Sequence, residues 1–138
     1  MLNYNQALPK QTLLQDLQMK EIKPIMKLVI RGKKREFISA IGKSLNIILP
    51  TEANTSTQSD KLTALWLSPD EWMIFSNEPV DENTNTYETE KLLNKSISKL
   101  NLGAVVDVTD QFVMINLKGN KIYELFQTGS PFNFNNFQ

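Results

Sequence analysis

The stretch Trp66-Leu67-Ser68-Pro69-Asp70-Glu71-Trp72 decides how the middle of this chain folds. Apolar, strand-like residues flank it, at 62–65 on one side and 73–75 on the other. Between the tryptophans, a proline fixes φ, and the acidic residues that follow it suit a tight connection. The pattern predicts a β-hairpin with a tryptophan at each shoulder.

The residues of this hairpin are also the candidate partner contacts of the chain. Tryptophan is enriched at interface hot spots, but it also buries ~150–250 Å² when it packs in a core. Both roles stay open for the tryptophans. Adjacent carboxylates here are expected to form the turn and not an acid–base pair, because no basic or metal-binding group accompanies them. The candidate partner-contact residues are Trp66, Pro69, Asp70, Glu71 and Trp72.

Hydrophobic periodicity predicts an α+β fold with mixed or antiparallel sheets and packed helices, in the order β-α-β-β-β-α-β-β-α. The first helix is expected to bury Phe37, Ile38, Ile41 and Leu45, and the second, capped at Asn85, to bury Leu92, Leu93, Ile97 and Leu100. The predicted strands cover 22–30, 47–49, 62–65, 73–75, 104–108 and 112–117, and a third helix covers 122–126.

The expected organisation is one domain over 13–134, with a flexible arm over 1–12 and a tail over 135–138. Leu13, Leu14 and Leu17 have near-helical spacing, which favours a short helix at the start of the domain. Residues 51–60 are polar and lack an apolar period, so we expect a mobile surface loop there.

The composition excludes several functional classes. The 138 residues include 15 basic and 15 acidic side chains, and this zero net charge argues against a nucleic-acid binder. No apolar run approaches the ~20 residues of a membrane span. The N-terminal residues lack a signal-peptide pattern and the chain has no cysteine, so the cytoplasm is the expected location. The chain has no cysteine and no histidine, which excludes triad catalysis and thiolate or imidazole metal sites. We therefore expect no catalytic, cofactor-binding or metal-binding residue in this chain.

Two further charged features stand out. Asp107 interrupts an apolar strand, and we expect it to cap a neighbouring backbone group or to pair with a lysine or arginine. The run Lys33-Lys34-Arg35 precedes a predicted helix, where basic residues oppose the helix dipole. It is either a solvated helix start or a contact for an acidic partner.

The heptapeptide closely resembles the W-L-G-P-D-E-W signature of the sarcosine oxidase gamma subunit family. Residues 28–50, 104–110 and 117–132 resemble further segments of that family, in the same order. Ser68 stands where the family has glycine, and Asn133 where it has aspartate. The sequence ends at Gln138, before the family's last strands and helix. The resemblance extends to the aminomethyltransferase superfamily, which implies a fold like its folate-binding domain, possessing fewer C-terminal elements.

The resemblance implies a non-catalytic, structural gamma subunit of a heterotetrameric sarcosine oxidase. Such an enzyme demethylates sarcosine to glycine, forms peroxide and passes the one-carbon unit to tetrahydrofolate. FAD, FMN, NAD and tetrahydrofolate are then expected on other subunits, and the alpha, beta and delta subunits are the expected partners. An uncovered apolar surface would favour self-association of the isolated chain. The alternative is a free-standing folate-binding or one-carbon-transfer module.

Overall fold

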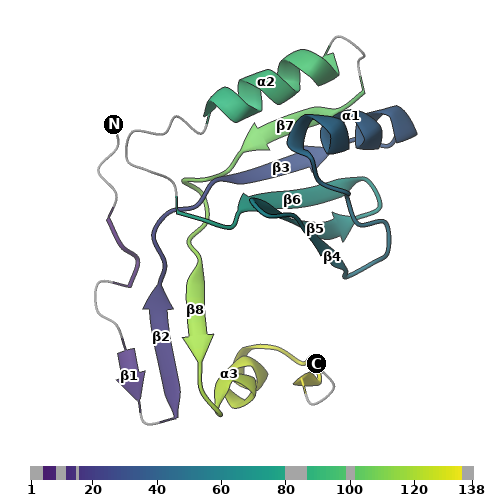
Figure 1. The fold of residues 1–138 in the computed structure, drawn as a ribbon. Coiled ribbons are helices and arrows are strands. Elements are labelled where there is room, and N and C mark those ends of the chain that lie inside the picture. The colour runs from purple at the N-terminus through teal and green to yellow at the C-terminus, as the bar shows by residue number, and fades with distance from the viewer. Residues whose placement is uncertain (1–4, 9–11, 15, 80–86, 99–101, 135–138) are drawn as a thin grey trace. The chain divides into compact units, whose positions relative to one another are not determined.

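The computed structural model describes residues 5–8, 12–14, 16–79, 87–98 and 102–134. They fall into two compact units, Lys23–Phe112 and an end unit made of Met1–Ile22 with Val113–Gln138. The sequence predicted a single domain over 13–134. The end unit is separate because strands from the two ends of the chain pair antiparallel, β2 (Leu17–Glu21) with β8 (Ile115–Lys118) (Figure 1).

The larger unit contains an antiparallel five-stranded sheet in the order β4-β5-β6-β3-β7. Leaving out β4, the connectivity β-α-β-β-α-β and this strand order give the split β-α-β arrangement. The strands are β3 (Lys27–Arg31), β4 (Ser56–Gln58), β5 (Leu62–Ser68), β6 (Glu71–Ser76) and β7 (Ala104–Asp107), and the helices are α1 (Arg35–Leu45) and α2 (Tyr87–Ser98).

One hydrophobic core lies between this sheet and the two helices (Figure 1). Alternate strand residues, such as Leu28 and Ile30, point into it because successive side chains of a strand face opposite sides. Each large side chain buried here stabilises the fold by about 1.5–3 kcal/mol relative to exposure. The largest fully buried side chains among the described residues are Trp72, Phe37, Leu28, Ile30, Ile41, Ile74, Leu93 and Ile97.

The predicted apolar faces of the helices are largely confirmed. Phe37 and Ile41 of α1 are buried, with Ile38 and Leu45 packed beside them. In α2 the prediction is wrong for Leu92, which is 69% exposed because its neighbour in sequence, Leu93, takes the position facing the sheet. The second-helix residues Asn85 and Leu100 lie outside the described residues.

Two strand predictions near the first helix are corrected. Residues 47–49 form no strand: Ile47 and Leu49 enter the core, whereas Ile48 is 81% exposed. The strand β4 lies instead at Ser56–Gln58, inside the predicted polar loop. It pairs antiparallel with β5, so tertiary pairing and not apolar content decides where the strand forms.

The end unit is a three-stranded antiparallel sheet in the order β1-β2-β8, with α3 (Ile122–Gly129). The short helix predicted on the early leucines is wrong, because they belong to β1 (Thr12–Leu14) and β2, which form a hairpin. The predicted strand over 112–117 begins only at Ile115. The turn before α3 requires Gly119, since its φ is 138° and a Cβ would lie 2.1 Å from the Asp16 carbonyl oxygen.

The described part of the chain thus has the antiparallel sheets and three helices of an α+β fold, as predicted. Among these helices none is both long enough and apolar enough to cross a membrane.

Candidate functional site

The predicted tryptophan hairpin is present. Strands β5 and β6 pair antiparallel, and Trp66 lies directly opposite Trp72. Between Trp66 and Ser68 the register shifts, so that Leu67 is an extra residue on β5 and forms a β-bulge. Leu62 and Ala64 of β5 face the core, so the alternation of the strand leaves Leu67 on the opposite face, where it is 43% exposed.

Trp72 is a core residue. Its exposed fraction is 1%, its ring lies 6.3 Å from that of Phe37, and its indole N–H donates a 2.7 Å hydrogen bond to the Pro50 carbonyl. Trp66 is partly buried and packs against the same core. Of the two roles open for Trp72, the geometry favours core packing, so it affects any partner contact through the fold of the hairpin.

Asp70 ties the hairpin turn to the connection between β3 and α1. Its carboxylate accepts a 2.9 Å hydrogen bond from the Ser68 hydroxyl and lies 3.5 Å from Arg31 Nε and 3.9 Å from Lys33 Nζ. The Ser68 hydrogen bond, assisted by these two cations, lowers the pKa of Asp70. The Asp70 carbonyl also accepts from the Gly32 N–H at 2.9 Å.

These contacts give the acidic turn and the basic run a partner within the chain. Lys33 faces Asp70, so at least this member of the Lys33-Lys34-Arg35 run is more than a solvated helix start. The Asp70 carboxylate stabilises the turn through its hydrogen bond with Ser68. The adjacent Glu71, the first residue of β6, is partly buried.

The surface that this turn presents to solvent is called the hairpin tip, and it comprises Leu67, Pro69, Arg31 and Lys33. The side chains of Arg31 and Lys33 are 64% and 85% exposed, and Pro69, two residues after Leu67, is exposed as well. Leu67 was missed as a candidate. The signal for it was an apolar residue directly after Trp66, where strict alternation calls for a polar one.

A second charged cluster lies where β7 leaves the sheet. As predicted, Asp107 caps a backbone group, the Thr109 N–H, at 2.8 Å. Its other carboxylate oxygen, Oδ2, is buried and has no hydrogen-bond partner among the described residues. Lys27 nearby is 3% exposed, and its ammonium donates to the Ile25 carbonyl at 3.0 Å. Burial lowers the pKa of Lys27, against the opposing effects of Asp110 and Asp107.

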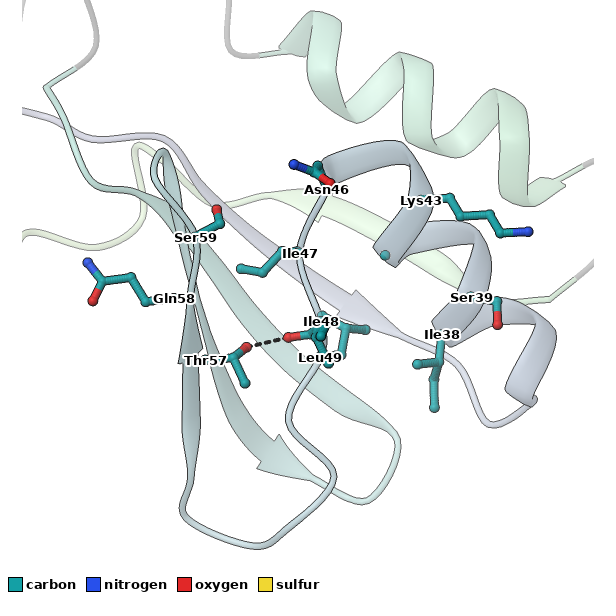
Figure 2. A pocket seen from close by; sticks show the side chains of 11 residues that line it. Ile38, Ser39, Lys43, Asn46, Ile47, Ile48, Leu49, Thr57, Gln58 and Ser59 are labelled. Carbon is teal, nitrogen blue, oxygen red and sulfur yellow. Dashed lines mark hydrogen bonds between the residues drawn. The ribbon is translucent and has the colours of Figure 1, made fainter.

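A third feature is a hollow of about 860 Å³ beside the first helix (Figure 2). It is lined by α1 residues between Ile38 and Lys43, by residues 46–49 and by residues 57–59. Figure 2 shows the Thr57 hydroxyl donating to the Ile48 carbonyl across it. The sequence did not reveal this hollow, because one of its walls is the strand β4 in the segment predicted as a loop.

In the described part of the chain, no group of three or more histidine, cysteine, aspartate or glutamate residues could hold a metal ion. The hairpin tip and the hollow beside α1 are the candidate binding surfaces.

Two comparisons with known proteins found matches, one to a family and one to a fold. A model of the sarcosine oxidase gamma subunit family matches residues 31–137. The fold is similar, with a TM-score of 0.73 and 17% identity, to a chain of the heterotetrameric sarcosine oxidase from Corynebacterium sp. U-96 in complex with pyrrole 2-carboxylate. That similarity covers 88% of this chain and 60% of that one. No curated protein sequence matches. The family match includes the tryptophan hairpin and most of the larger unit, and the chain belongs to the sarcosine oxidase gamma subunit family.

Proposed function

We propose that this chain is the non-catalytic, structural gamma subunit of a heterotetrameric, flavin-dependent sarcosine oxidase. The observation that carries the proposal is the family match over residues 31–137. In this proposal the assembled enzyme, in the cytoplasm, demethylates sarcosine to glycine, forms peroxide and transfers the one-carbon unit to tetrahydrofolate. Other subunits hold FAD, FMN, NAD and tetrahydrofolate, and the alpha, beta and delta subunits are the partners of this chain.

The exposed apolar surface of the chain supports a role in assembly. Several large apolar side chains of the end unit lie far more open to solvent than core residues do, and exposed apolar surface is often covered in a protein–protein contact. Phe132 is 57% exposed and Phe126 of α3 is 41% exposed. Val113, Ile115 and Tyr123 of the same end unit are exposed as well.

Affinity purification of the tagged chain from its native cells tests the proposal. We expect larger subunits to co-purify, identified by mass spectrometry, and the preparation to show the visible absorption of bound flavin. A colourless chain recovered without partners would overturn the proposal. Titration of the isolated chain with tetrahydrofolate would then test the alternative of a folate-binding module.

A pair of leucine variants tests whether the hairpin tip contacts those subunits. Leu67→Glu places a charge on the tip, whereas Leu92→Glu places the same charge on the exposed face of α2. If the tip is a contact, Leu67→Glu lowers the affinity for the larger subunits about tenfold, which corresponds to ~1.4 kcal/mol. Equal recovery of the subunits by both variants, at equal thermal stability, would exclude the tip from the interface.

A further inference from the structure

The outer edge of the five-stranded sheet at β4 carries backbone groups directed away from the sheet. The Trp66 N–H donates to the Thr55 carbonyl, and the Ser59 N–H donates to the Leu62 carbonyl. In the β4–β5 register Thr55 lies opposite Trp66, and Ser59 lies opposite Leu62. Hydrogen-bonded pairs of an antiparallel ladder alternate with pairs that share no hydrogen bond, so the backbone groups of Thr57 also point toward β5. The N–H and C=O groups of Ser56 and Gln58 therefore point away from β5.

These outward groups have no hydrogen-bond partner among the described residues. The opposite edge of the same sheet differs. There, the Val108 N–H donates to the Lys27 carbonyl, so every second residue of β7 counted from Val108 directs its backbone groups toward β3. Val105 is not one of these residues, so its carbonyl points away from β3. It accepts a 3.3 Å hydrogen bond from the Asn94 side chain of α2. One edge is thus partly covered by a helix, whereas the β4 edge stays open.

The β4 edge also lacks the residues that usually prevent strand pairing. Ser56-Thr57-Gln58 has no proline and no charged side chain, the common devices that blunt an exposed edge. The hollow beside α1 adjoins this edge on the side that Thr57 faces, and Ile48 projects there with 81% of its surface exposed (Figure 2). An edge with free backbone groups and an adjacent apolar hollow has the two elements of strand-addition sites.

The charge of the hollow restricts what can bind. Lys43 is the single charged residue among those that line it. Lys43 forms no ion pair within the described part of the chain. A segment that carries a carboxylate near its apolar residues therefore complements the hollow better than a neutral or basic one.

We infer that the β4 edge docks an extended segment of a larger oxidase subunit, which adds to the sheet as a sixth strand. The backbone of the segment pairs with Ser56 and Gln58, an apolar side chain covers Ile48, and an acidic residue meets Lys43. This inference rests on the proposed function, because it takes the partner to be a subunit of the same enzyme.

Residue-level amide hydrogen exchange, measured on the free chain and on the purified complex, tests the pairing. The Ser56 and Gln58 amides are expected to exchange fast in the free chain and at least about tenfold more slowly in the complex. The Thr57 amide points toward β5, so it is protected in both states and serves as the internal control. Fast exchange at Ser56 and Gln58 in a complex that contains the flavin subunits would overturn the inference alone.

A matched pair of variants tests the same edge by a second route. Gln58→Pro removes an outward N–H without removing a bond to β5, whereas Gln58→Thr keeps that N–H. We expect Gln58→Pro to recover at least about tenfold less of the larger subunits, and Gln58→Thr to recover them as the unaltered chain does. Recovery of the subunits by Gln58→Pro at the level of the unaltered chain would contradict strand addition.

A third variant covers the case in which proline disturbs the fold. Ile48→Asp alters only an exposed side chain, and it repels the acidic residue expected opposite Lys43, so it should also lower recovery about tenfold. Unchanged recovery with Ile48→Asp overturns the docking of an apolar, acidic segment. If the unaltered chain itself recovers no flavin subunits, the proposed function is overturned, and the inference with it.

Discussion

Helices with similar apolar periodicity occur in both units of this protein, but only those of the larger unit bury their apolar side chains. In Lys23–Phe112, α1 turns Phe37 and Ile41 into a core shared with the sheet and α2. In the end unit, α3 also carries apolar residues at helical spacing, yet none of its residues is buried. An amphipathic sequence is enough to predict a helix, but burial needs a second layer of structure to cover its apolar face.

Aromatic contacts show the same contrast. Phe37 and Trp72 meet inside the larger unit, where both are buried. In the end unit, Phe126 stacks on Phe134 at 5.2 Å, and Phe132 meets Phe134 edge-on at 5.1 Å, while Phe126 and Phe132 stay exposed. The buried core thus lies in the larger unit, whereas Phe126 and Phe132 of the end unit stay open to solvent.

The largest expected effect compares one aromatic residue from each unit. Trp72→Ala removes a buried ring and its hydrogen bond, so it should lower the free energy of unfolding by about 3–5 kcal/mol. Phe126→Ala removes a partly exposed ring and should cost less than about 1 kcal/mol. Urea unfolding followed by circular dichroism measures both. Comparable losses would show that the end unit has a core of its own. Through the loss of fold, Trp72→Ala should also weaken recovery of the larger subunits.

The next comparison uses one glycine from each unit. A Cβ at Gly103 would lie 2.2 Å from the Arg31 carbonyl oxygen and would press on the Phe37 ring, so Gly103→Ala should cost about 1–3 kcal/mol. A Cβ at Gly129 meets nothing within 4 Å, and alanine there should be neutral or stabilise by up to about 1 kcal/mol. Thermal unfolding of both variants gives the two values. A costly Gly129→Ala would indicate that α3 is packed against something.

A smaller effect is expected from the buried lysine of the larger unit. Burial holds the pKa of Lys27 in the folded chain below its ordinary value of 10.5. At a pH between the folded pKa and 10.5, the unfolded chain therefore binds more protons than the folded chain. The free energy of unfolding should therefore rise with pH between these two pKa values. Below the folded pKa, the full destabilisation caused by burying the charged lysine should be present. Lys27→Met keeps an apolar stem without the charge. It should raise the free energy of unfolding by about 1 kcal/mol at neutral pH.

The control for this prediction is Lys23→Met, which changes an exposed lysine of the same unit. Urea unfolding between neutral pH and pH 10 measures the slope. We expect the alkaline rise in stability to disappear in Lys27→Met and to persist in Lys23→Met. A rise that persists in both variants would assign it to other groups.

The smallest effect is expected at the hairpin turn. The pKa of Asp70 is lowered in the folded chain, chiefly by the Ser68 hydroxyl, so its ionised form stabilises the fold above the ordinary value of 3.8. That contribution is lost as the pH falls through the lowered pKa. Asp70→Asn should therefore be slightly less stable at neutral pH and should lose less stability on acidification. Thermal unfolding at pH 7 and at pH 3 checks this, and an identical acid response in both proteins would rule it out.

The sequence was most informative where a pattern is local. The hairpin between Trp66 and Trp72 follows from two apolar runs and a proline turn, and the buried face of α1 follows from its helical period. The sequence was least informative where pairing with a partner strand decides whether a segment forms a strand. β4 forms in a polar segment because β5 lies beside it, and the early leucines are strands because β1 pairs with β2.

The sequence by itself determined the α+β class, the tryptophan hairpin and the family of this protein, because periodicity, turn chemistry and motif spacing are local properties. Only the tertiary structure decided that Trp72 is a core residue, that the chain divides into two units and that the β4 edge is open. The physical reason is that burial and strand pairing depend on contacts between residues far apart in the chain, which no local pattern specifies.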